Sequence, residues 1–168
     1  MGGWDKGVDY FYAYNLILRL IERVQGKTKC YLVIALIQLR NGSRISEAVR
    51  AFKRWLMSGY HELHVEVSKK KHPEARLMII PTGLGDLRLT CLDLSNVEDS
   101  KLKKRVQNTL YRYARINTHS LRYAYINYLL RSGVNPAIIS KLIRHSKIDT
   151  LLKYVQEKAS ETVLREYY

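Results

Sequence analysis

The chain has 168 residues, enough for one domain that buries roughly 70% of the surface of its unfolded chain. Charged residues make up 26% and apolar residues 46%, which excludes both a disordered polar chain and a membrane protein. The 29 Lys and Arg outnumber the 15 Asp and Glu, so the formal net charge is +14 and a polyanionic partner is expected. Nucleic acid is favoured over a membrane surface, because no apolar run reaches about 18 residues and no basic amphipathic tail stands apart.

The two cysteines and the amino terminus bear on where the protein works. Cys30 and Cys91 both lie among apolar neighbours, so we expect reduced core thiols of an intracellular protein, with a disulfide as the alternative. The first residues show no basic stretch followed by an apolar one, and Gly2 lacks the Ser or Thr at residue 6 that myristoylation requires. We therefore expect a cytoplasmic location, in association with the polyanion.

Helical periodicity appears three times in the first third of the chain. Residues 8–24 carry apolar side chains at helical spacing. Residues 30–39 are apolar nearly all round, which predicts a central buried helix. A third helix is predicted over residues 45–57, so Arg44 lies where the turn Asn41-Gly42-Ser43 enters a helix.

Alternating apolar and polar residues predict a β-hairpin in the middle of the chain. Residues 63–67 and 77–79 alternate in this way, with Leu77 and Ile79 as the apolar positions of the second strand, and the basic segment 68–73 forms the tip. Residues 87–91 repeat the alternation and could add another strand. The sheet is therefore either this antiparallel hairpin alone or a three-stranded sheet.

Helices return from about Val97 to the end of the chain. Thr118 can cap the start of the second of them, and Gly133 stands where a glycine ends a helix. Asn135-Pro136 supplies an N-cap followed by proline at the first helical position, so another helix begins there. A last helix is predicted over residues 149–156.

Three groups of polar residues on these elements could carry chemistry. His119 and Arg122 lie three residues apart in the first turn of a helix, so they share a face near its positive end and could grip a phosphate. Arg44 is at a similar helix start. Tyr154 follows His145 by nine residues, across a turn. Taken singly, each has a simpler interpretation as a surface cation or a packed amphipathic ring.

Taken in order, these residues resemble the catalytic domain of the tyrosine recombinases, the phage integrase and Xer family. Asn41–Glu47 reads NGSRISE, similar to the family's TGLRISE, and His119–Arg122 matches its HxLR box. His145 then leads to Tyr154 at the family's spacing. The resemblance spans about residues 8–157 and suits a remote branch, archaeal or viral, which would place the protein in a host cell's cytoplasm.

The sequence departs from the family pattern without losing a catalytic group. The hairpin tip is not the common GKGxK, which leaves its lysine open: Lys69 fits best after Val67-Ser68, with Lys70 and Lys71 as alternatives. The other departures are Ser43 for the usual Leu, Tyr123 for the frequent second histidine, and Arg144 for the glycine of the GH pair.

The resemblance implies a mainly α, mixed catalytic fold and an enzyme that cleaves and rejoins DNA through a 3′-phosphotyrosine intermediate. Two arginines would neutralise the charge that grows on the phosphate, and two histidines would relay protons. A tyrosine would attack, and the hairpin lysine would protonate the leaving 5′-oxygen. No phosphate loop, CxxC, HExxH or HxH spacing occurs in the sequence, so we expect neither ATP nor a metal or other cofactor. The implied catalytic residues are Arg44, Lys69, His119, Arg122, His145 and Tyr154.

The expected organisation is one catalytic domain over residues 1–168, the carboxy-terminal half of a longer recombinase. Residues 158–168 would form a flexible tail. The expected partners are double-stranded DNA and further copies of the chain, as a tetramer on DNA, with no membrane. Delivery of Tyr154 in cis or in trans stays open. Two other functions also stay open: a nicking-closing enzyme of the type IB topoisomerase kind, and a non-catalytic basic DNA-binding module.

Overall fold

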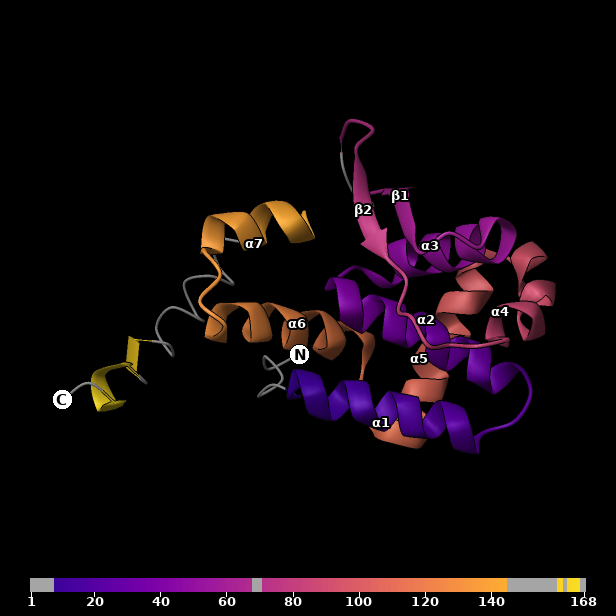
Figure 1. Ribbon diagram of the computed structural model, residues 1–168, viewed down its shortest axis with the longest axis horizontal. Helices are drawn as coiled ribbons and strands as arrows, with labels where there is room; N and C mark the ends of the chain where they lie inside the picture. Colours follow the sequence, from indigo (N-terminus) through magenta and orange to yellow (C-terminus); the bar gives the residue numbers. More distant parts are fainter. Residues whose placement is uncertain (1–7, 68–70, 145–159, 162, 167–168) are drawn as a thin grey trace.

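The protein is mainly helical with a small two-stranded antiparallel sheet, which confirms the predicted fold class (Figure 1). The structure is a computed structural model that describes residues 8–67, 71–144, 160–161 and 163–166. No helix within these ranges is long and apolar enough to cross a membrane. The helices are α1 Tyr10–Arg23, α2 Lys27–Asn41, α3 Ile45–Ser58, α4 Leu87–Thr90, α5 Asp99–Ala114, α6 Thr118–Arg131 and α7 Pro136–Ile143, with a 3-10 turn η1 at Leu92–Asn96.

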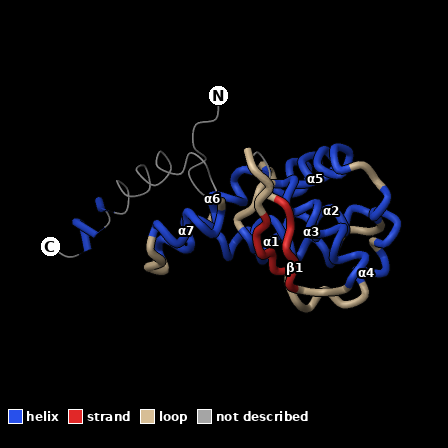
Figure 2. The backbone as a smooth tube through the Cα atoms, turned by 90° about the horizontal axis from the view of Figure 1, so that it is seen from above, coloured by secondary structure: helices blue, strands red, loops and turns tan. Residues whose placement is uncertain are grey.

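Helix α2 lies at the centre of the fold, as its apolar sequence predicts. Helices α1, α3, α5 and α6 all pack against it (Figures 1 and 2). Each fully buried Leu or Ile contributes about 1.5–3 kcal/mol to the free energy of unfolding, so this helix is the main source of core stability. Its buried residues are Cys30, Leu32, Val33, Ile34, Ala35, Leu36, Ile37, Gln38, Leu39 and Asn41.

The sheet pairs β1 Glu62–Glu66 with β2 Ala75–Ile79. The predicted hairpin is confirmed, but the prediction that Leu77 lies on the inward face of β2 was wrong. Arg76 and Met78 are buried, whereas Leu77 is 45% exposed. Side chains alternate along a strand, so Leu77 must point outward when Arg76 points inward to pair with the buried Glu47 of α3. The sequence pattern assumes that an arginine is exposed, so it could not predict which face of β2 is buried.

The third strand considered for residues 87–91 does not form. Leu87–Thr90 is the short helix α4, and Leu89 is 63% exposed. The outer edge of β1 is already bonded, because Arg50 of α3 donates to Glu66 O at 2.9 Å and Arg54 donates to His64 O. An edge whose carbonyls are satisfied by side chains does not recruit another strand.

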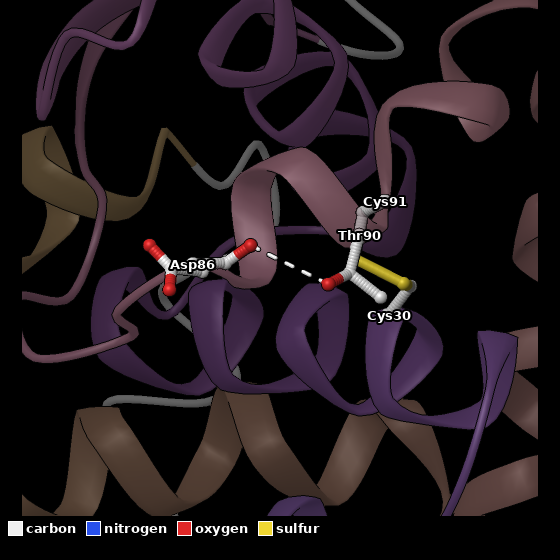
Figure 3. The surroundings of a disulfide bond; sticks show 4 residues. All are labelled: Cys30, Asp86, Thr90 and Cys91. Carbon is white, nitrogen blue, oxygen red and sulfur yellow. Dashed lines mark hydrogen bonds between the residues drawn. A yellow bond between two sulfur atoms is a disulfide. The ribbon is translucent and has the colours of Figure 1, made fainter.

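The two cysteines are joined in a disulfide, so the expectation of reduced thiols was wrong. Figure 3 shows Cys30 on α2 bonded to Cys91 at the end of α4. The apolar neighbours correctly indicated burial, since both residues are fully buried. What they could not indicate is that the fold brings the two Cα atoms to 5.7 Å, within the range a disulfide needs.

Helices α5, α6 and α7 follow the predicted order, and their ends follow the capping residues. Asn117 rather than Thr118 caps α6, because its extended backbone lets its side chain accept from Ser120 N at 2.8 Å. Gly133 has φ +82° just after α6, and Asn135 caps α7 with Pro136 behind it. Helices α6 and α7 lie at one end of the molecule and α4 at the other (Figures 1 and 2). The helix predicted over residues 149–156 lies outside the described residues.

Candidate active site

Buried polar side chains gather where α2 ends and α3, α6 and β2 meet it. Burying a polar group is unfavourable unless it is bonded, so such a concentration needs an explanation. Elsewhere in the part of the chain that the structure describes, Thr109 of α5 is the one further buried polar side chain. The cluster consists of Gln38, Asn41, Ser43, Glu47, Arg76, Thr118, Ser120 and Arg122.

The turn between α2 and α3 positions Arg44. Gly42 has φ +57°, a left-handed conformation that ends α2 and redirects the chain into α3. The amide of Gln38 donates to Ser43 O at 3.1 Å and to Thr118 O at 3.0 Å, which ties the turn to the start of α6. Arg44 is the N-cap residue of α3, immediately after this bonded turn.

A buried carboxylate bridges two arginines beneath the turn. Glu47 is fully buried in the first turn of α3; its Oε2 lies 3.3 Å from Arg44 Nη1 and its Oε1 lies 3.3 Å from Arg76 Nη1. Arg76 Nη2 also donates to Asn41 O at 2.7 Å. Burial lowers the pKa of Arg76, and the charge of Glu47 opposes that shift. The Asn41 side chain pairs with both backbone groups of Ile79, so β2 holds this network from the other side.

Arg122 approaches the same region from α6. Its side chain is only 4% exposed, and its Nη2 donates to Ile143 O at 3.1 Å. Arg44 Nη1 lies 3.5 Å from the carbonyl oxygen of the next residue, Arg144. The two guanidiniums therefore meet at the carboxyl end of α7, whose last carbonyls lack partners within the helix.

The electrostatics of Arg122 favour an anion. Burial, and then the positive charge of Arg44, lower the pKa of Arg122 to about 10, so it remains charged at neutral pH. Its Nη1 is buried and has no hydrogen-bond partner among the described residues. An N–H group in this state is unfavourable by about 1–3 kcal/mol until something accepts from it. A phosphate oxygen is a suitable acceptor because guanidinium binds phosphate in a bidentate manner.

The structure brings two of the predicted catalytic residues together, Arg44 and Arg122. His119 is exposed in the first turn of α6, one turn before Arg122. Three predicted residues and one alternative lysine lie outside the described residues, and Lys71 is exposed in the connection between β1 and β2. Those outside are Lys69, Lys70, His145 and Tyr154.

Sequence reasoning missed Arg76, and it included Glu47 only as the last residue of the NGSRISE motif. A signal for Glu47 existed, since a carboxylate three residues after Arg44 can pair with it on a helix. Arg76 gave no such signal, because its partner belongs to another element. Gln38 was hidden in the same way inside the apolar run of α2.

Comparison with known proteins supplies the class. No family model and no solved structure matches the chain. It is 37% identical over 169 residues to "Putative integrase ORF241" of Acidianus two-tailed virus, covering 98% of this chain and 69% of the relative. It is 31% identical over 202 residues to "Putative integrase V10" of Sputnik virophage, covering 96% of this chain and 88% of the relative. A shorter match, 36% over 74 residues, covers 44% of this chain and 25% of "Probable integrase/recombinase" of Acholeplasma phage L2.

A helical domain in which the buried Arg122 lies near the half-buried Arg44 thus has viral integrases among its relatives. The chain belongs to the family of these integrases.

Proposed function

We propose that the protein is a tyrosine recombinase that cleaves and rejoins DNA strands through a 3′-phosphotyrosine intermediate. One observation carries the proposal: the buried Arg122 guanidinium lies beside Arg44 and has an N–H group with no acceptor among the described residues. The names of the viral relatives support DNA as the substrate and integration of a viral genome as the role.

The two arginines act on the phosphate. Negative charge grows on its non-bridging oxygens in the transition state, and guanidiniums already held in place stabilise that charge without reorganising. Glu47 and the end of α7 hold these groups through the contacts described above. The buried environment strengthens the interaction, because little water competes for the phosphate oxygens.

The proposed covalent step uses only side chains of the protein and the DNA. The phenol oxygen of Tyr154 bonds to phosphorus while the bond from phosphorus to the 5′-oxygen breaks. The phenol proton passes to a histidine, His119 or His145, and Lys69 gives a proton to the leaving 5′-oxygen. Rejoining is the reverse: the 5′-hydroxyl attacks the phosphotyrosine, and Tyr154 leaves. The phosphodiester energy is kept in the protein–DNA bond, so no ATP is consumed.

The charge distribution supports binding of a polyanionic partner by the part of the chain that contains Arg122. No Asp or Glu stands between Asp99 and Asp149, a stretch with eleven Lys and Arg. This stretch contains α5, α6 and α7, and therefore Arg122. Duplex DNA is the partner that such a surface and such a site would share, and strand exchange would require several copies on it, a tetramer.

A nicked suicide duplex tests the covalent chemistry. The parent protein should become covalently attached to the DNA strand, whereas Tyr154→Phe should form no adduct and bind DNA within a few fold of the parent. Tyr113→Phe, at an exposed tyrosine of α5, is the matched control and should react normally. An adduct retained by Tyr154→Phe contradicts the nucleophile, and Tyr167 and Tyr168 would be mapped next.

The same assay separates the alternatives. Joining of strands from two duplexes indicates a recombinase, and relaxation with no such joining indicates a topoisomerase-like enzyme. Binding with no adduct from any variant indicates a DNA-binding module.

A further inference from the structure

Arg144, the residue that ends α7, has an unusual backbone. Its φ is +53°, and among the described residues only Arg115 and Arg144 have positive φ without being glycine. Glycine adopts this conformation without strain, whereas any residue with a Cβ does so at a disadvantage. The tyrosine recombinases that the sequence resembles have glycine at this place. An arginine here calls for a role that offsets the strain.

The Arg144 side chain supplies such a role, because it forms an ion pair with Glu74, next to the tip of the hairpin. Its Nη1 lies 2.6 Å from Glu74 Oε1, and the two side chains are 37% and 33% exposed. Glu74 O accepts from Val67 N at 2.7 Å, which is the last described rung of the hairpin before its tip. The pair therefore joins the carboxyl end of α7 to the hairpin.

Among the described residues, α6 is the element that α7 contacts most. Its buried residues Ile139 and Ile143 form a small cluster with Ile126 of α6, separate from the main core. Figure 1 shows α7 lying above α6, with one end directed towards the hairpin. That end carries the carbonyl oxygens that accept from Arg122 and Arg44.

We propose that Arg144 is a positioning residue: its ion pair with Glu74 fixes the end of α7, whose Ile143 and Arg144 carbonyls then hold the Arg122 and Arg44 guanidiniums. The effect on DNA cleavage rests on the proposed function, but the effect on the two guanidiniums does not. The side chain of Arg144 acts on the site only through backbone geometry.

Arg144→Gly separates this role from a structural one. Glycine relieves the left-handed backbone, so the thermal midpoint should stay level or rise. Single-turnover cleavage at saturating DNA should nevertheless fall about fivefold, the size expected for a part-exposed ion pair. A merely structural arginine would give the opposite result, unchanged or faster cleavage with a more stable protein.

Three further variants test the path through Glu74. Glu74→Gln should reproduce the loss of cleavage, and Glu74→Gln with Arg144→Gly should be no slower than either alone. Arg144→Lys keeps a cation within reach of Glu74 and should restore most of the rate.

Arg115→Gly is the matched control. Arg115 also ends a helix with φ +55°, so the change relieves the same strain and removes the same charge. Arg115 instead lies over the ring of Tyr111, with its Cζ 4.9 Å from the ring centroid. Because Arg115 also belongs to the acid-free basic stretch, this control is read from the Nη signals of Arg44 and Arg122, which its replacement should leave unchanged.

Nitrogen-15 NMR of the arginine guanidiniums reads the site without any reaction. Held guanidiniums rotate slowly and give resolved Nη signals, so those of Arg44 and Arg122 should broaden in Arg144→Gly and Glu74→Gln but not in Arg115→Gly. Unchanged signals in the first two variants overturn the proposal. If the parent protein fails to cleave DNA, the proposed function fails, and the NMR comparison still decides the role of Arg144.

Discussion

Gly42 lies directly against the ring of Tyr125: a Cβ built on Gly42 would come within 2.3 Å of Tyr125 Cδ1. Tyr125 belongs to α6 and is itself buried, with its ring 5.9 Å from that of Tyr10 on α1. The turn before Arg44 can therefore approach α6 closely only because residue 42 has no side chain. This contact sets the distance between the helices that carry Arg44 and Arg122.

Replacing Gly42 by Ala should lower the free energy of unfolding by about 2–4 kcal/mol, because the new methyl group adds overlap with Tyr125 to the strain of positive φ. Cleavage should fall as the two helices separate. Urea unfolding measures the first effect. Gly133→Ala is the control: Gly133 has φ +82°, but no atom of the described residues beyond its chain neighbours lies within 4 Å of a Cβ built on it, so this variant should lose only about 1 kcal/mol. Equal losses for the two variants would show that Tyr125 simply moves aside.

Arg76→Met should destabilise the protein by about 3–5 kcal/mol, since it breaks a buried ion pair at Glu47. Adding Glu47→Leu should recover much of that stability, because no buried carboxylate remains. Cleavage should stay low in the double variant, because Arg44 loses its bond to Glu47 Oε2. Denaturant unfolding and single-turnover cleavage test both statements. Arg165→Met, which removes an exposed pair with Glu161, should change neither.

Reducing the disulfide should lower the free energy of unfolding by about 4 kcal/mol, the chain-entropy value for a loop of 61 residues. Thermal unfolding with and without a reductant measures this. A double variant, Cys30→Ala with Cys91→Ala, should show the lower midpoint in both buffers. Finding two free thiols in the unreduced, unfolded chain would mean that the cysteines are not paired.

DNA affinity should depend steeply on salt, and α5 offers a way to localise the effect. Lys101, Lys104 and Arg105 lie exposed along this helix within the acid-free stretch. Replacing all three by Gln should flatten the slope of log K against log salt by about 0.9 for each phosphate that the variant no longer neutralises. Replacing Lys27 and Lys29, at the start of α2, by Gln is the control, and it should change the slope less. An identical slope in all proteins would place the DNA on another surface.

Lys69→Ala should cleave an ordinary phosphodiester poorly and a 5′-bridging phosphorothiolate nearly as well as the parent, since sulfur leaves without needing a proton. Arg44→Ala should stay defective by about 10²-fold or more on both substrates. If Lys70→Ala or Lys71→Ala shows this rescue instead, that lysine is the general acid rather than Lys69. No rescue in any of the three would point to another proton donor.

The fold was predictable where local chemistry decides it. The apolar run of α2 indicated its central place, and Gly133 and Asn135-Pro136 marked helix ends that the structure confirms. The prediction failed where a distant partner decides. The strand considered at residues 87–91 is a helix followed directly by Cys91, which is joined to Cys30. The register of β2 depends on the partner of Arg76 on α3.

The site shows the same division. Arg44 and Arg122 could be selected because each stands at a helix start within a motif, and the structure brings them together. The carbonyls of Ile143 and Arg144 that accept from them have no sequence signal, since every residue carries a carbonyl. The Arg144–Glu74 pair likewise depends on where α7 ends relative to the hairpin. The catalytic roles of all six predicted residues, Arg44, Lys69, His119, Arg122, His145 and Tyr154, stay predictions.

We expect the disulfide to make the two halves of the site differ in stability. The covalent ring from Cys30 to Cys91 encloses Arg44, Glu47 and Arg76, whereas Arg122 lies beyond it on α6. Opening of α6 and α7 would be a sub-global event that leaves the ring folded, with a lower free energy than complete unfolding. Amide hydrogens of α6 and α7 should then exchange sooner than those of α2. On heating, the enzyme would lose its arginine pair, and with it catalysis, while most of its helical structure is still intact.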